Sequence, residues 1–252
     1  MEMSDETSEA RERRTAVITG AGSGVGRAIA VRLSGDGWDL ALIGRTRSRI
    51  EETVTSCRQN IGQFGSYDCD VGNATEVATA ATAILSDFPR VDAVINAAGE
   101  NISQRSLDVL MVDDFERVIR TNLNGSFFVL REFLPRMRSQ KSGTIINIVS
   151  DVGLLANPKA GTAYVASKFG QGAMIQSINH EEQAHGIRAC ALFPGDINTP
   201  LLDKRAHPPS EEARLKMLQT EDLSECVSLV LNLPARAVVE QIVIRPRFPS
   251  ST

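Results

Sequence analysis

A short apolar segment that runs directly into a glycine-rich turn is the feature that most constrains how this chain can fold. Residues 15–19 are apolar or β-branched, which is typical of a buried strand, and residues 27–34 resemble a helix. Between them the glycines follow the spacing Gly20-x-x-x-Gly24-x-Gly26. A strand, a glycine turn and a helix together can hold a pyrophosphate on backbone N–H groups and on the helix N-terminus. Without that context, the same glycines would indicate only a flexible linker.

Apolar strand-like segments alternate with helix-like segments along the rest of the chain. Further strands are predicted at residues 40–43, 65–68, 91–95, 143–149, 187–193 and 238–244. Helices are predicted between them at residues 48–59, 74–86, 113–138, 162–184 and 221–231. This alternation implies right-handed crossovers and a parallel sheet that is covered on both faces. We therefore predict a Rossmann-type, doubly wound α/β fold with seven parallel strands, in one domain at residues 15–252 after a disordered leader at residues 1–14.

Composition excludes several classes of partner. The net charge of −4 offers no basic footprint for nucleic acid. No apolar run approaches the ~18 residues that cross a bilayer, and the charged leader lacks the apolar core of a signal peptide. The four scattered cysteines have no metal-ligand spacing and fit buried free thiols in a reducing compartment. We expect a cytoplasmic protein that binds no metal, nucleic acid or membrane.

The residues after the second predicted strand indicate which dinucleotide the chain prefers. In dinucleotide-binding folds, an acidic residue at this place bonds the ribose 2′-hydroxyl, whereas arginine suits a 2′-phosphate. This chain has Gly44 and Arg45 there and no acid, which favours NADP over NAD. Alternatively, Arg45 and Arg47 form the solvated start of a helix.

Polar residues also follow the later strands. Asp70 follows the third strand, where it could face an adenine amino group or cap the next helix, a role for which Asn73 competes. Asn96 follows the fourth strand and could tie neighbouring strands together, and Ser150 ends the fifth. Asn122 lies in an apolar helical stretch, where its amide must find helix backbone, water or a site. Because ligands of open parallel sheets bind at the carboxyl ends of the strands, we expect one common site there.

Tyr164 and Lys168 lie four residues apart in the predicted helix at residues 162–184, so they share one helical face. A free phenol has a pKa near ~10, and a nearby cation lowers it by roughly 1–3 units. A tyrosine with such a pKa can exchange a proton with a reacting oxygen at ordinary pH. The alternative is that Tyr164 is a packing residue and Lys168 is solvated.

Taken together, these segments resemble the short-chain dehydrogenase/reductase family from residue 15 through residue 199. The matching pieces are residues 19–26, residues 96–99, Asn122, residues 147–150, residues 164–168 and Pro194-Gly195. The resemblance implies that Tyr164 is the general acid/base and that Ser150 bonds the substrate oxygen. It also implies that Lys168 holds the nicotinamide ribose and lowers the pKa of Tyr164, and that Asn122 positions a water in a proton relay.

The same resemblance implies a set of cofactor contacts along the strand ends. They are Gly20, Ser23, Gly24, Val25, Gly26, Arg45, Thr46, Asp70, Val71, Asn96, Ala97, Gly99, Tyr164, Lys168, Pro194, Gly195, Ile197 and Thr199. Residues 201–220 are expected to form a substrate flap. The two long helices at residues 113–138 and 162–184 resemble those that pair in homodimers and homotetramers of the family, so we expect a homo-oligomer.

The expected activity is NADP-dependent hydride transfer between nicotinamide and a ketone or secondary alcohol. The C-terminal residues 241–246 lack the common Asp-Gly-Gly close and resemble a branch that acts on small hydroxy acids and varied ketones. Two alternatives stay open, namely a 3-oxoacyl thioester reductase and a catalytically idle regulator that senses NADP.

Overall fold

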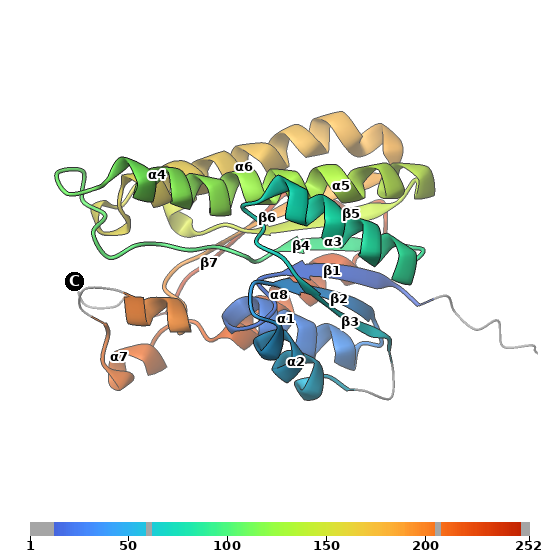
Figure 1. The fold of residues 1–252 in the computed structure, drawn as a ribbon, viewed down its shortest axis with the longest axis horizontal. Coiled ribbons are helices and arrows are strands. Elements are labelled where there is room, and N and C mark those ends of the chain that lie inside the picture. The colour runs from blue at the N-terminus through green and yellow to red at the C-terminus, as the bar shows by residue number, and fades with distance from the viewer. Residues whose placement is uncertain (1–12, 59–61, 205–207, 248–252) are drawn as a thin grey trace, which may run out of the picture.

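Seven parallel strands form a single sheet in the order β3-β2-β1-β4-β5-β6-β7 in the computed structural model (Figure 1). The structure describes residues 13–58, 62–204 and 208–247. The strands are β1 (Thr15–Thr19), β2 (Asp39–Gly44), β3 (Phe64–Asp68), β4 (Ala93–Asn96), β5 (Gly143–Ile148), β6 (Ile187–Pro194) and β7 (Gln241–Ile244). The prediction of a Rossmann-type fold with a seven-stranded parallel sheet is confirmed.

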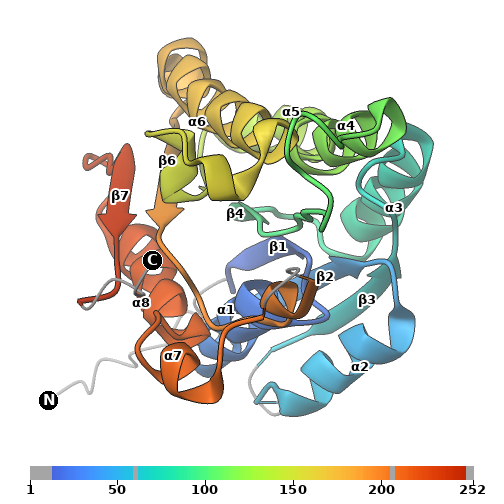
Figure 2. The same ribbon diagram turned by 90° about the vertical axis from the view of Figure 1, so that its left-hand side faces the viewer.

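Helices cover both faces of this sheet (Figure 2). On one face lie α1 (Gly24–Gly35), α2 (Arg47–Ser56) and α8 (Thr220–Asn232). On the other face lie α3 (Ala74–Asp87), α4 (Val112–Ile119), α5 (Gly125–Gln140) and α6 (Thr162–Glu182). Each face has its own apolar core, and every residue of β1, β4 and β5 is buried. Strands that are covered on both faces read as continuous apolar runs, which explains why they stand out in the sequence.

The chain reverses its direction across the sheet between β1 and β4. From β1 it proceeds outward through β2 to β3, and it then returns to place β4 on the other side of β1. The crossovers on the two sides of this point run to opposite faces, which leaves a crevice at the carboxyl ends of β1 and β4. Topology therefore places any ligand at the ends of the central strands.

The long helix predicted at residues 113–138 is interrupted in the structure. A π-turn, η1 (Arg120–Asn124), separates α4 from α5, and Asn122 lies within it. Single π-turns inside α-helices occur frequently at functional sites because they redirect backbone groups. Helix α6 follows the prediction closely and ends in a short 3₁₀ turn, η4 (Gln183–His185).

The two ends of the predicted domain are only partly described. Residues 1–12 of the predicted leader lie outside the described residues, but Arg13 and Arg14 belong to the structured part. The Arg14 guanidinium lies 4.1 Å from the centre of the Trp38 ring and bonds the Leu231 carbonyl, so ordered structure includes the end of the segment assigned to the leader. Among the described residues, no helix has the length and apolar character needed to span a membrane.

Candidate active site

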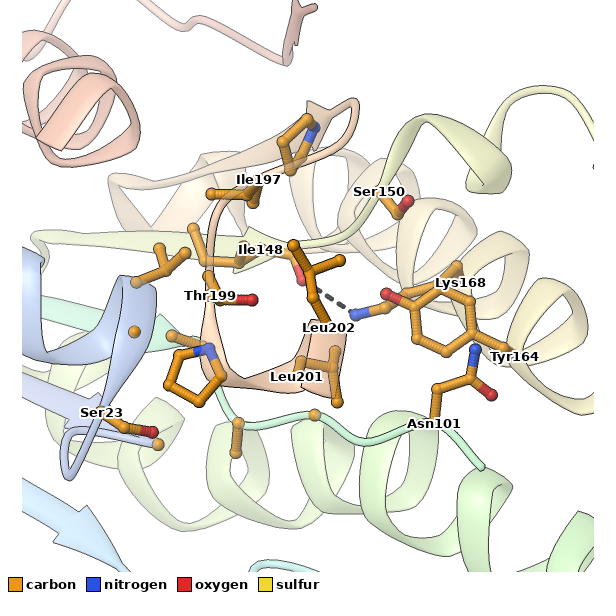
Figure 3. Close-up of a pocket in the computed structure, with 18 of the residues that line it drawn as sticks. Ser23, Asn101, Ile148, Ser150, Tyr164, Lys168, Ile197, Thr199, Leu201 and Leu202 are labelled. Atoms are coloured by element: carbon orange, nitrogen blue, oxygen red, sulfur yellow. Dashed lines mark hydrogen bonds between the residues drawn. The ribbon is translucent and has the colours of Figure 1, made fainter. Parts of the chain in front are cut away.

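A cleft of about 1150 Å³ runs along the carboxyl ends of the strands, over the point where the chain reverses between β1 and β4. Its walls come from the loops after β1, β2, β3, β4 and β5, from α6, and from the segment after β6. Figure 3 shows Ser23 from the glycine turn at one end and Tyr164, Lys168 and Ser150 at the other. The structure thus brings together residues that are far apart in the chain, from Gly20 to Met217, as the parallel topology requires.

The glycine turn packs so closely against neighbouring backbone that two of its positions require glycine. Gly20 has φ +65°, and a Cβ there would lie 2.8 Å from the backbone of Ala98. A Cβ on Gly26 would lie 2.4 Å from the Gly20 carbonyl oxygen. Helix α1 begins at Gly24, and the Ser23 side chain makes no capping bond to its first turn. Backbone N–H groups at a helix start carry partial positive charge, so this turn fits a pyrophosphate.

Arg27 clamps the glycine turn to α2, a contact that the sequence did not reveal. Its guanidinium donates to the Gly22 carbonyl at 2.6 Å, to the Thr53 hydroxyl at 3.0 Å and to Glu52 at 2.9 Å. Thr53 is itself buried and donates to the Ala21 carbonyl at 2.8 Å. Two side chains therefore fix the turn from outside the cleft.

Two exposed arginines stand at the far end of the cleft, after β2. Arg45 and Thr46 line it as predicted, and Arg49 in the first turn of α2 joins them. Arg49 lies over the glycine turn, because a Cβ on Gly22 would approach the Arg49 Cβ to 3.1 Å. Arg47 instead pairs with Glu51 at 3.0 Å and does not line the cleft, so the solvated-helix interpretation fits Arg47 alone. Arg49 lies only four residues after Arg45 in the chain, and this nearness could have pointed to it.

Asp70 and Asn73 divide the roles for which they competed in the sequence. The Asn73 side chain accepts from the N–H groups of Thr75 and Glu76, so it is the N-cap of α3. The Asp70 carboxylate accepts from Gly72 N–H at 3.0 Å, and both Asp70 and Val71 line the cleft. Asp70 is thus held beside the cleft by its own turn.

Asn96 was predicted to contact the cofactor, but the structure does not place it at the cleft. It is buried at the end of β4 and does not line the cleft. Its amide donates to the Asn147 side-chain oxygen at 3.0 Å, which ties β4 to β5. The prediction that an asparagine links neighbouring strands describes its place better, because the backbone after it, at Ala97 and Gly99, forms the cleft wall.

Tyr164, Lys168 and Ser150 form one wall of the cleft (Figure 3). The Lys168 ammonium lies 5.5 Å from the centre of the Tyr164 ring and donates to the Ile148 carbonyl at 3.0 Å. Lys168 is buried, and this burial lowers the pKa of its ammonium to about 7. Ser150 lies two residues after the end of β5 and caps a 3₁₀ turn, η2 (Asp151–Gly153), where its hydroxyl accepts from the Val152 N–H at 3.4 Å.

Asn122 is not among the described residues that line the cleft. It is fully buried in the π-turn, where its side-chain oxygen accepts from Glu100 N–H at 2.8 Å. Its amide donates to the Glu100 carbonyl and to the Ser167 hydroxyl, each at 3.0 Å. The Asn122 side chain therefore fastens the loop after β4 to α6, and its expected role in positioning a water stays a prediction.

The remaining part of the cleft is bounded by loop residues that the sequence left unassigned and by the predicted flap. Asn101, Arg105, Lys159 and the predicted flap contribute to it. Asn101 is fixed by bonds to Ile102 N–H and to the Ala160 carbonyl. The flap contains η5 (Pro200–Lys204) and α7 (Glu211–Leu215), with residues 205–207 outside the described residues. Its apolar contributions to the cleft are Leu201, Leu202, Pro209, Ala213 and Met217. No periodic pattern marks these residues, so only the tertiary structure could assign them.

Both a family model and known proteins match most of this chain. A model of the family described as short chain dehydrogenase matches residues 14–209. An uncharacterized oxidoreductase of Staphylococcus aureus is 31% identical over 233 residues, which cover 92% of this chain and 97% of that protein.

Two solved structures are similar as a whole. An alcohol dehydrogenase from the archaeon Thermococcus sibiricus, complexed with 5-hydroxy-NADP, has a TM-score of 0.85 and 29% identity, covering 96% of this chain and 100% of that one. A 3-ketoacyl-ACP reductase from Sinorhizobium meliloti has a TM-score of 0.83 and 29% identity, covering 91% and 96%.

Proposed function

This chain belongs to the short-chain dehydrogenase family, and we propose that it is an NADP-dependent oxidoreductase acting on a ketone or a secondary alcohol. The observation that carries the proposal is the composition of one continuous cleft. One end has an open glycine turn, an uncapped helix start and two arginines, and the other has Tyr164 beside Lys168 and Ser150. Members of this family are oxidoreductases that use a nicotinamide dinucleotide, and the glycine turn fits such a group.

The chain's own residues would then perform binding, orientation and proton transfer. When bound, the nicotinamide supplies or accepts the hydride. Tyr164 donates a proton to the substrate oxygen during reduction and removes it during oxidation, and Ser150 donates a hydrogen bond to that oxygen as charge develops. The Lys168 ammonium favours the ionised phenol and holds the ribose. The buried Asn122 keeps the loop at Gly99 in place behind them.

Preference for NADP rests on Arg45 and Arg49. Both are exposed at the end of the cleft after β2, where the adenosine ribose of a dinucleotide would lie. Guanidinium groups suit phosphate because they offer paired donors and a permanent charge. The similar Thermococcus sibiricus structure was solved with 5-hydroxy-NADP, which supports the same choice.

A 3-oxoacyl thioester reductase is the second candidate, and the similarity to the Sinorhizobium meliloti reductase favours it. Activity on acyl-carrier thioesters and none on free ketones would establish it. The third alternative, a catalytically idle NADP sensor, would bind NADPH and reduce no carbonyl compound. Small hydroxy acids and varied ketones belong in the first panel of substrates.

We also propose that the protein acts as a homo-oligomer in the cytoplasm. Phe127 on α5 and Phe169 on α6 are 49% and 43% exposed, which is a high apolar exposure for neighbouring helices. All four cysteines are free thiols, as a reducing compartment allows. Light scattering of the purified protein tests the oligomeric state, and a monomer would contradict it.

The experiment that tests the function uses both tyrosines of the chain. NADPH and NADH are first titrated against purified protein by nicotinamide fluorescence, and the tighter binder is then used in a carbonyl screen. Tyr164→Phe should reduce turnover by a factor of about 10²–10⁴, because it removes the general acid. Tyr67→Phe is the control, because Tyr67 does not line the cleft and its hydroxyl donates to Asp87 at a distance of 2.6 Å. Unchanged turnover in Tyr164→Phe would eliminate this mechanism.

A further inference from the structure

Gln171 is a fully buried glutamine that the chemistry proposed above does not use. It lies three residues after Lys168 on the same face of α6 and does not line the cleft. A buried amide that finds no partners destabilises a fold, so its two polar atoms must be satisfied within the protein. The partners that they find connect the cleft wall to the π-turn.

The bonds form a continuous chain of four buried residues. The Gln171 side-chain oxygen accepts from the Lys168 ammonium at 2.7 Å, and the Gln171 amide nitrogen donates to the Ser126 hydroxyl at 2.6 Å. Ser126 in turn donates to the Asn122 backbone carbonyl at 2.8 Å. Lys168, Gln171, Ser126 and Asn122 are each less than 5% exposed. Behind Lys168, which lines the cleft, the other three residues lie outside the cleft lining, so water competes little for the bonds that join them.

The direction of the chain is determined by its two ends. The ammonium has only donors, so it requires the oxygen of the Gln171 amide. The Asn122 carbonyl has only acceptor sites, so it requires the Ser126 proton, which leaves the Ser126 oxygen to accept from the Gln171 nitrogen. A rotated Gln171 amide would place its NH₂ group against the ammonium and lose both bonds. The π-turn thus orients the amide, and the amide orients Lys168.

In the described structure, the hydrogen-bond partners of the Lys168 ammonium are both uncharged. These are the Ile148 carbonyl and the Gln171 oxygen, at 3.0 Å and 2.7 Å. Charged and titratable groups on the elements around it are otherwise engaged. Asp151 on η2 pairs with Arg245. Glu100 after β4 accepts from Thr121 and pairs with Arg117, which also pairs with Asp114 on α4. Tyr164 is the titratable neighbour on its own helix.

We propose that Gln171 is a positioning residue for Lys168, whose amide, oriented by Ser126 and the Asn122 carbonyl, holds the ammonium in place and protonated at the cleft wall. The proposal rests on the proposed function for the use of that ammonium, which is to bind the ribose and to favour ionisation of Tyr164. Gln171 and Ser126 are 45 residues apart, and neither touches the cleft.

The test measures the pKa of Lys168 directly, without cofactor or substrate. The chain has five lysines, so ¹³C-labelled lysine spectra can be assigned with single substitutions. Burial already lowers the pKa of Lys168 to about 7, and a strong acceptor opposes that shift. Gln171→Met keeps the length and volume of the side chain but removes the acceptor, so the pKa of Lys168 should fall by about half a unit or more.

Two further variants keep the outcome decisive. Gln171→Glu places a carboxylate at the same distance, so it should raise the pKa of Lys168 above the wild-type value and carries the test if Gln171→Met fails to fold. Ser126→Ala should give a smaller fall, because the acceptor stays but loses its orientation. Gln176→Met is the matched control, since Gln176 is an exposed glutamine on the same helix. A pKa of Lys168 that is unchanged in folded Gln171→Met or Gln171→Glu would overturn the proposal.

A second measurement connects the amide to the cleft. Gln171→Met should weaken NADPH binding at pH 7 by about tenfold, which is typical for loss of a hydrogen bond to a charged group. In alcohol oxidation, the acid limb of the rate profile should move to higher pH, because a less charged Lys168 leaves the phenol harder to ionise. If the wild type reduces no carbonyl but the pKa of Lys168 still responds, the proposed function fails and the positioning role stands.

Discussion

The two ends of the cleft hold charge in opposite ways. At the catalytic wall, the Lys168 ammonium is buried and bonded to Ile148 and Gln171. At the end after β2, Arg45 and Arg49 are exposed on a loop and on the first turn of α2. A buried charge is sensitive to every neighbour because the surroundings cannot rearrange as water does, whereas an exposed charge is screened. We therefore expect the first end to control a pKa and the second to attract an anion.

The difference predicts that substitutions at the buried wall have the largest effects. Lys168→Met should lower kcat/KM by roughly 10²–10³, because the ribose and the Tyr164 phenolate lose their cation together. The fold should survive, because methionine fills the space without requiring hydration. Steady-state kinetics with NADPH give the loss, and a decrease below threefold would show that the buried ammonium is dispensable.

The lowered pKa of Lys168 predicts how the free energy of unfolding changes with pH. Its folded-state pKa of about 7 lies below the unfolded value near ~10.4, so between these pH values the unfolded chain binds more protons. The free energy of unfolding of the wild type should therefore rise with pH from about 7 to 10, relative to Lys168→Met. Denaturant unfolding of both proteins at pH 6, 8 and 10 measures the difference, and a flat difference would contradict the buried charge.

The glycine turn should be the next most sensitive place. Gly26→Ala puts a Cβ 2.4 Å from the Gly20 carbonyl oxygen, so the turn must shift and NADPH affinity should fall by about 30-fold or more. Gly35→Ala is the matched control at the other end of α1, since its Cβ would have no neighbour closer than 3.9 Å among the described residues. Equal NADPH affinities in the two variants, measured by fluorescence titration, would remove the cofactor from this turn.

At the exposed end, effects should be smaller and sensitive to salt. Arg45→Asp should weaken NADPH binding by about tenfold and leave NADH binding equal or tighter, because the 2′-phosphate loses a charged donor. Arg47→Asp is the control, since Arg47 pairs with Glu51 outside the cleft. Raising the ionic strength should reduce the difference in NADPH affinity between the wild type and Arg45→Asp. If NADPH affinity survives and NADH gains nothing, the 2′-phosphate site is elsewhere.

The smallest effect is expected at a surface ion pair near the catalytic wall. Arg245 after β7 pairs with Asp151 at 3.2 Å, and the two side chains are 55% and 30% exposed. Exposed pairs contribute about 0–1 kcal/mol, so Arg245→Ala should change the free energy of unfolding by no more than that. Turnover should stay within about threefold of the wild type. A larger loss of turnover would show that this ion pair helps to hold the cleft wall formed by Ser150, Tyr164 and Lys168.

Much of the site could be predicted because its signals are local in the chain. Strand, glycine turn and helix follow one another directly, and Tyr164 and Lys168 share a face through helix periodicity alone. The roles of Asn96 and Asn122 were harder to predict. Both were expected at the cofactor or in the proton relay, and both are buried behind the cleft, where they join β4 to β5 and the loop at Glu100 to α6. An asparagine next to a site and one behind it look the same in sequence.

By itself, the amino-acid sequence determined the elements, their parallel arrangement and the group of residues at the strand ends, because apolar periodicity and glycine spacing are properties of neighbouring residues. Only the tertiary structure decided which polar groups meet inside. The path from Lys168 through Gln171 to Ser126 depends on how α6 lies against the first turn of α5, and packing between distant segments has no signature in the spacing of either. Burial then gives those contacts their strength, because water competes little for them.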